Sequence, residues 1–197
     1  MSTTNKPPSR GRPRRFQLDE AIATAQHLFH ARGYDALSVA EVTDALGIKP
    51  PSFYAAFGNK MGLFTRVLER YSETGAIHFS DLLGPDRPVA DSLAALLEEA
   101  AIHYAGDSSA TGCLVLEGSR CNDPGARKAA CAFQAAAEEM IRLYIAERHP
   151  DEADRVTDFV SATMAGLSAK ARSGYSLGRL RATARIASLG LAQTLEA

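Results

Sequence analysis

Features typical of membrane, secreted and disulfide-linked proteins are scarce in this chain of 197 residues. No apolar run approaches the roughly 20 residues of a membrane span, and the polar start MSTTNKPPSR lacks the apolar segment of a signal peptide. We therefore expect a soluble, cytoplasmic protein with no membrane partner. The three cysteines, Cys113, Cys121 and Cys131, form an odd set without a C-x-x-C pair, so a disulfide framework is not expected.

Motifs of catalysis and metal binding are also missing. The sequence has no Walker loop and no Gly-x-Gly-x-x-Gly, the patterns that mark phosphate binding in common enzyme families. Its single Gly-x-Ser-x-Gly match, GYSLG (174–178), joins two predicted helices and lacks the strand that precedes the serine of a hydrolase. Its five histidines are scattered, and none belongs to an HExxH pattern. We predict no catalytic site, no cofactor and no metal centre.

Strand-like alternation is absent, and no segment repeats at a period of about 20–50 residues. Apolar residues recur instead at helical spacing along the chain. The sequence therefore predicts an all-α protein of about nine helices, over residues 18–31, 39–46, 50–57, 59–83, 88–105, 111–122, 124–149, 151–172 and 176–196.

Charge is nearly balanced overall, with 22 basic and 23 acidic residues and a formal net charge of −1. The N-terminal segment is the exception, because its prolines and glycine are interspersed with basic residues and no acid. These basic residues are Lys6, Arg10, Arg12, Arg14 and Arg15. Basic N-terminal arms often lie on nucleic acid, and a tail that only aids solubility is an equal alternative.

Two short helices joined by a tight turn follow the first predicted helix. Ser38 and Glu41 have the spacing of a capping box, which starts a helix that ends at Gly47. Pro50 and Pro51 start the next helix, because a missing N–H is tolerated in a first helical turn. With a further helix on either side, this pair predicts a helix-turn-helix, whose second helix enters the major groove of DNA.

The second of these helices divides its side chains between core and surface. Phe53 and Phe57 are four residues apart and are predicted to pack in a small core. Ser52 and Tyr54 lie on other faces, and we interpret them as DNA contacts because basic residues flank the helix. The alternative is that the aromatic residues of this helix only hold the core together.

Three stretches resemble the TetR family of bacterial transcription regulators. They are GRPRRF (11–16), EAIATAQHLFHARGYDALSVAEVTDALGI (20–48) and KPPSFYAAFGNKMGLF (49–64). The resemblance covers the first third of the chain in the family's order. It implies a homodimer that represses transcription until a small-molecule effector enters its C-terminal domain. A two-fold dimer of this kind predicts near-palindromic double-stranded operator DNA as its partner.

The resemblance also assigns DNA contacts by position. Phosphate contacts would be Ser38, Tyr54 and Lys60. Residues near the bases and arginines of the arm complete the expected DNA-binding set, which adds Lys49, Pro50, Ser52, Arg12, Arg14 and Arg15. Because two adjacent prolines leave few side chains able to read bases, we expect specificity to come partly from the arm and from DNA shape.

The resemblance divides the chain into an arm (1–15), a DNA-binding domain (16–60) and a ligand-binding and dimerisation domain (61–197). The ligand pocket should lie among the helices of the last part. Its expected wall, although each residue type is more often plain core, is Leu68, Tyr71, Phe79, Leu97, His103, Tyr104, Cys113, Leu116, Phe133 and Met140.

The last two predicted helices have broad apolar faces with small residues beside them. The resemblance implies that they form a four-helix dimer interface, whereas periodicity alone equally allows an intramolecular core. The residues concerned are Val156, Phe159, Val160, Thr163, Met164, Leu167, Leu180, Ala184, Ala187 and Leu191.

Two alternatives to a ligand-released repressor stay open. The stretches TGCLVLEGSR (111–120) and GLSAKARSGYSLGRL (166–180) resemble a subgroup with a cysteine at the start of the sixth helix, and some of its members respond to metals or reactive electrophiles. Cys113 or Cys121 would then be a redox, electrophile or metal sensor. The other alternative is a helical ligand carrier or enzyme in which the arm is incidental.

Overall fold

The computed structural model describes residues 17–195, and helices dominate that range. They are α1 (Leu18–Arg32), α2 (Val39–Ala45), α3 (Pro50–Phe57), α4 (Lys60–Thr74), α5 (Phe79–Leu82), α6 (Val89–Gly106), α7 (Leu114–Gly118), α8 (Pro124–Ala146), the 3-10 turn η1 (Pro150–Glu152), α9 (Ala153–Arg172) and α10 (Leu177–Leu195). The described residues contain no strand, which confirms the all-α fold. No helix among them is long and apolar enough to cross a membrane.

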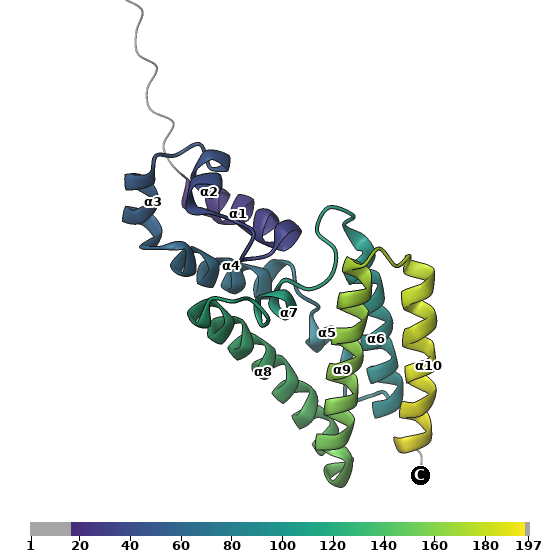
Figure 1. Cartoon of the computed structure of the whole chain (residues 1–197). Coiled ribbons are helices and arrows are strands. Elements are labelled where there is room, and N and C mark those ends of the chain that lie inside the picture. Colours follow the sequence, from purple (N-terminus) through teal and green to yellow (C-terminus); the bar gives the residue numbers. More distant parts are fainter. Residues whose placement is uncertain (1–16, 196–197) are drawn as a thin grey trace, which may run out of the picture.

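The helices form two groups with separate hydrophobic cores (Figure 1). The first core lies between α1, α2, α3 and α4 and extends to α7 and the start of α8. The second lies between α6, α9, α10 and the end of α8. The boundary expected at residue 60 coincides with the start of α4, yet the buried face of α4 belongs to the first core. Helix α4 therefore connects the two groups as part of the N-terminal one.

The chain between α4 and α6 differs from the sequence-based expectation. Periodicity predicted one helix over 59–83, whereas α4 ends at Thr74 and the short α5 begins at Phe79. Gly75 follows α4, and a Cβ atom there would lie 2.8 Å from the ring of Tyr71. The close approach of that ring leaves room only for glycine at the end of the helix.

A tight turn fixes α3 against α4. Gly58 adopts φ 74° and ψ −57°, a conformation that glycine reaches without a steric penalty. Asn59 then caps α4 by accepting a hydrogen bond from the backbone N–H of Gly62 at 2.7 Å. A Cβ atom at Gly62 would lie 2.2 Å from the carbonyl oxygen of Phe57, so this position requires glycine.

Candidate nucleic-acid interface and ligand cavity

Helices α2 and α3 form the predicted helix-turn-helix, and each start is fixed by its own residues. The Ser38 hydroxyl accepts from the Glu41 N–H at 3.2 Å, and the Glu41 carboxylate accepts from the Ser38 N–H at 2.8 Å. This reciprocal pair is the predicted capping box. Gly47 makes the turn at φ 63°, and α3 begins with its two prolines after an extended Lys49.

Helix α3 turns two aromatic rings inward and leaves the third outside. Phe53 and Phe57 are buried in the first core, as the sequence predicted. Tyr54 is 52% exposed, and its ring meets the edge of Phe53 at 5.4 Å between centroids. We call the exposed side of this helix the reading surface, which consists of Lys49, Pro50, Pro51, Ser52 and Tyr54.

The hydroxyl of Ser38 is already engaged within the protein. It donates to Glu41 Oε2 at 2.7 Å, and the same carboxylate forms an ion pair with Arg32 at 2.7 Å. Hydrogen bonds from the backbone and side chain of Ser38, followed by that from Arg32, lower the pKa of Glu41 to about 2. A phosphate at Ser38 would have to displace Glu41 to receive the hydroxyl proton, so the predicted contact competes with the helix cap.

Lys60 is also engaged in hydrogen bonds within the protein. Its ammonium donates to the carbonyl oxygens of Tyr34 at 2.9 Å and Leu37 at 2.7 Å, and it lies 4.0 Å from the centroid of the Tyr34 ring. It therefore fastens the start of α4 to the chain between α1 and α2, with one N–H left for a phosphate. The predicted arm contacts Arg12, Arg14 and Arg15 lie outside the described residues.

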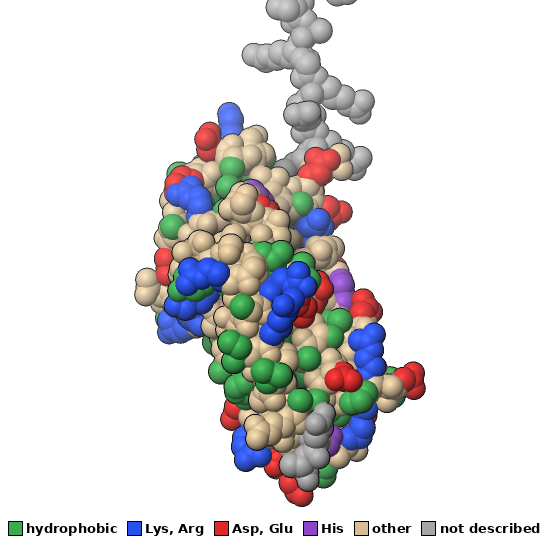
Figure 2. Space-filling view, turned by 90° about the vertical axis from the view of Figure 1, so that its right-hand side faces the viewer, with side chains coloured by type: hydrophobic (Ala, Val, Ile, Leu, Met, Phe, Trp, Pro, Cys, Tyr) green, Lys and Arg blue, Asp and Glu red, His purple; other side chains and the backbone are tan. Residues whose placement is uncertain are grey.

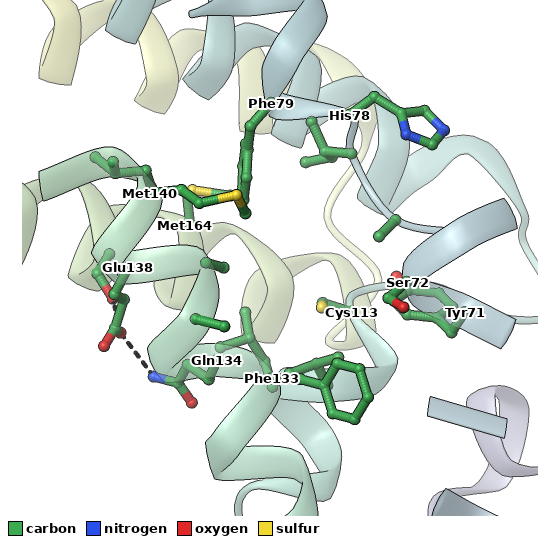
Figure 3. A pocket seen from close by; sticks show the side chains of 18 of the residues that line it. Tyr71, Ser72, His78, Phe79, Cys113, Phe133, Gln134, Glu138, Met140 and Met164 are labelled. Atoms are coloured by element: carbon green, nitrogen blue, oxygen red, sulfur yellow. Dashed lines mark hydrogen bonds between the residues drawn. The ribbon is translucent and has the colours of Figure 1, made fainter. Parts of the chain in front are cut away.

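A cavity of about 390 Å³ lies among α4, α5, α6, α7, α8 and α9 (Figure 3). All the residues predicted for its wall line it except Leu68 and Leu97, which are fully buried in the first and second cores. Sequence reasoning missed the polar group of Gln134, Glu138 and Ser161 on one side. The spacing of four between Gln134 and Glu138 in an alanine-rich helix was the available signal.

Two thiols among the described residues lack the environment of reactive cysteines. Burial raises the pKa of Cys113, and burial followed by the charge of the nearby Asp35 raises the pKa of Cys121. A raised pKa keeps the thiol protonated and poorly nucleophilic at neutral pH. These surroundings do not support a role for either cysteine as a reactive sensor.

Comparisons with known proteins agree with this geometry. Residues 21–67 match the family model for bacterial regulatory proteins of the tetR family. The chain is 54% identical over 186 residues to the HTH-type transcriptional repressor BdcR of Escherichia coli (strain K12), covering 94% of each chain. It is 31% identical over 183 residues to the HTH-type transcriptional repressor ComR of the same strain, covering 87% of each. The chain belongs to the TetR family.

The fold of this TetR-family regulator is also close to solved structures. A cysteine mutant of the TetR family transcriptional regulator CifR, in complex with 26-bp double-strand operator DNA, superposes with a TM-score of 0.81. The two chains are 30% identical, and the match covers 90% of this chain and 98% of CifR. The regulator is thus a DNA-binding transcription factor and not an enzyme.

A cluster of polar contacts joins the end of α1, in the N-terminal group of helices, to the cavity. His30 Nε2 lies 3.0 Å from the carbonyl oxygen of Gly112, and because a carbonyl only accepts, Nε2 carries the proton. Arg172 donates to the carbonyl oxygens of His30 at 3.0 Å and Thr111 at 3.2 Å. The imidazole also meets the edge of Tyr71, a cavity residue, at 5.5 Å between centroids. The end of α1 therefore contacts the cavity wall directly.

The proposed dimer residues need correction. Seven of them pack inside the protomer, because α6 lies against the faces of α9 and α10 that the resemblance assigned to the dimer. They are Val156, Val160, Met164, Leu167, Leu180, Ala184 and Leu191. Met164 also lines the cavity. Phe159, Thr163 and Ala187 keep part of their surface outside.

Other apolar side chains of these helices remain exposed. Ile186 and Leu189 of α10 are each 72% exposed, and Phe159 of α9 is 43% exposed. Figure 2 shows hydrophobic side chains gathered over the lower half of the face on the α10 side of the regulator. A partner would therefore meet this outer face, not the buried one.

Within residues 17–195 no cluster of three or more potential metal ligands occurs.

Proposed function

We propose that the protein is a cytoplasmic transcriptional repressor that binds near-palindromic operator DNA as a homodimer and releases it when a small molecule occupies the cavity. The names of BdcR and ComR as repressors and the operator complex of CifR support this proposal. The cavity volume of about 390 Å³ lies in the range typical of small-molecule sites.

The continuity of α4 is the observation that carries the proposal. The helix begins at Lys60, beside the end of α3, and its last turns place Tyr71 and Ser72 on the cavity wall. A ligand that favours one position of Tyr71 over another therefore biases the orientation of α3. Such a ligand releases DNA only to the extent that it binds the two arrangements with different affinity.

The reading surface suits a contact that combines phosphate binding with few base hydrogen bonds. Ser52 and Tyr54 offer hydroxyls, and Lys49 offers a charge at the start of the helix. The adjacent prolines offer no donor, so DNA shape and the basic arm supply part of the specificity. In a two-fold dimer the two reading helices would lie about 34–36 Å apart, in successive major grooves.

The proposal is tested by fluorescence anisotropy with a labelled duplex from the region upstream of the protein's own gene. We expect saturable, sequence-selective binding whose affinity falls steeply as salt is raised, because phosphate contacts release counterions. A scrambled duplex of the same composition is the control. Equal affinity for both duplexes, or no dependence on salt, contradicts the proposal.

A further inference from the structure

The cavity has an unusual balance of charge. Among its described lining residues, Glu138 is the sole Asp, Glu, Lys or Arg. The other polar groups of the wall are hydroxyls, an amide, a thiol and two imidazoles. A carboxylate at the wall without a lysine or arginine partner favours cations and repels anions.

Glu138 is held in place by neutral donors. Its Oε1 atom accepts hydrogen bonds from Gln134 Nε2 at 2.9 Å and from the Ser161 hydroxyl. No ion pair involves Glu138, and Oε2 accepts no hydrogen bond, within residues 17–195. Because the amide of Gln134 directs its NH₂ to the carboxylate, its carbonyl oxygen is left as a second acceptor. Glu138 Oε2 and the carbonyl oxygen of Gln134 are therefore available as hydrogen-bond acceptors for a ligand.

The rest of the cavity suits an apolar body. Figure 3 shows Gln134 and Glu138 on the opposite side from Tyr71 and Ser72, with Phe79, Met140 and Met164 along another side. Methionine side chains adapt to irregular shapes, and aromatic faces attract cations. A ligand with one polar end and an apolar remainder would match this distribution.

We propose that the cavity binds an apolar small molecule that carries a protonated amine, with the Glu138 carboxylate receiving the ammonium group. Gln134 and Ser161 act as positioning residues that hold Oε1 and leave Oε2 to the ligand. The inference rests on the proposed function, because it names the chemical class of the effector of that same cavity. Anions of the same shape are excluded by repulsion from Glu138.

Three probes that share one apolar body test the inference: 4-phenylbutylamine, 4-phenylbutan-1-ol and 4-phenylbutanoate. Isothermal titration calorimetry on the full chain should show that the amine binds at least about tenfold more tightly than the carboxylate. Glu138→Gln should weaken amine binding by about ten- to a hundredfold, the range for hydrogen bonds to charged groups. It should leave the affinity for the alcohol within about twofold.

Glu147 provides the matched control. It lies at the C-cap of the same helix, is exposed, and takes part in no ion pair within the described residues. Glu147→Gln should bind all three probes like the wild type. The inference is overturned if Glu138→Gln binds the amine normally, if the carboxylate binds as tightly as the amine, or if no probe binds.

A charge-reversal variant guards against a merely structural effect. If Glu138→Gln weakens all three probes equally, Glu138→Lys decides, because the inference requires it to prefer the carboxylate over the amine. Absence of that reversal overturns the inference.

Operator binding, measured separately, distinguishes the proposed ligand class from the proposed release mechanism. If the amine binds through Glu138 and the operator stays bound, the ligand class stands and the release mechanism fails. If the alcohol alone releases the operator, and Glu138→Gln does not change that release, the release mechanism stands and the ligand class fails.

Discussion

Tyr54 presents a hydroxyl on a ring that stays exposed while Phe53 and Phe57 are buried beside it. A phenol at the edge of a reading helix suits a phosphate oxygen, which has the same position in every DNA sequence. We predict that Tyr54→Phe lowers the affinity for all duplexes by about tenfold, the value of one hydrogen bond to a charged group. Anisotropy titrations with operator and unrelated DNA measure this loss. Tyr175→Phe, in the turn between α9 and α10, should have no effect. A loss confined to one base pair would show that Tyr54 reads sequence.

His30 makes the folded state sensitive to acid. Burial lowers the pKa of its imidazole, the hydrogen bond to Gly112 partly offsets this, and the charges of Arg172 and His103 lower the pKa further, while Asp107 raises it. The unfolded chain therefore binds a proton first as the pH falls below about 6.5. The free energy of unfolding then decreases toward lower pH, by at most about 1.4 kcal/mol per pH unit for one proton.

Urea denaturation between pH 7.5 and 5 measures this dependence. His30→Gln retains a donor for Gly112 but does not titrate, so its stability should fall less over the same range. Parallel curves for the wild type and the variant would show that His30 contributes nothing to the acid sensitivity.

Single polar residues are where sequence patterns reach their limit. The resemblance assigned Ser38 and Lys60 to phosphate, and their positions at helix starts are consistent with that role. The structure shows both in intramolecular hydrogen bonds. Ser38 caps a helix, and Lys60 donates to the carbonyl oxygens of Tyr34 and Leu37. A group at a helix start serves either purpose, and only the path of the neighbouring loop decides between them.

At the scale of elements, the turn between α3 and α4 sets the angle of the reading helix. A Cβ atom at Gly62 would lie 2.2 Å from the backbone oxygen of Phe57, which has no flexible end to move away. We predict that Gly62→Ala lowers the free energy of unfolding by about 1–3 kcal/mol, as for other overpacked sites, and weakens operator binding in addition. Gly178→Ala is the control, because a Cβ atom on this residue of α10 would meet nothing within 4 Å. Thermal denaturation of both variants, with the control at least as stable as the wild type, decides the matter.

Helix periodicity and capping residues predicted most of the element boundaries, since these depend on residues close in sequence. The capping box of Ser38 and the proline start of α3 are local in this sense. The break between α4 and α5 is local only in part, because the side chain of Gln26 from α1, as well as the nearby ring of Tyr71, limits the space for a Cβ atom at Gly75. Tertiary packing of this kind leaves no mark on apolar spacing.

At the scale of the whole molecule, periodicity located the apolar faces of α9 and α10 but could not say what covers them. The inward faces pack on α6 within one protomer, so seven of the ten residues first expected at a dimer interface are internal. The cavity was predicted better, since its wall draws on aromatic and cysteine residues that stand out in sequence. Its polar side was missed, because Ser161 approaches Glu138 from a separate helix.

The exposed apolar residues on the outer face of α10 lead to a prediction about dimer formation. Ile186 and Leu189 are the most exposed large apolar side chains among the described residues, and they lie three apart on one helix. If they form the centre of the dimer interface, Ile186→Asp combined with Leu189→Asp places desolvated charges there and separates the protomers. Light scattering should then change from twice the 21.0 kDa of one chain to that single mass. Operator affinity should fall by about a hundredfold or more, because each copy then holds one half-site without the benefit of linkage. Leu143→Asp on α8, which is 52% exposed, should leave both measurements unchanged. A double variant that remains dimeric would place the interface on another face.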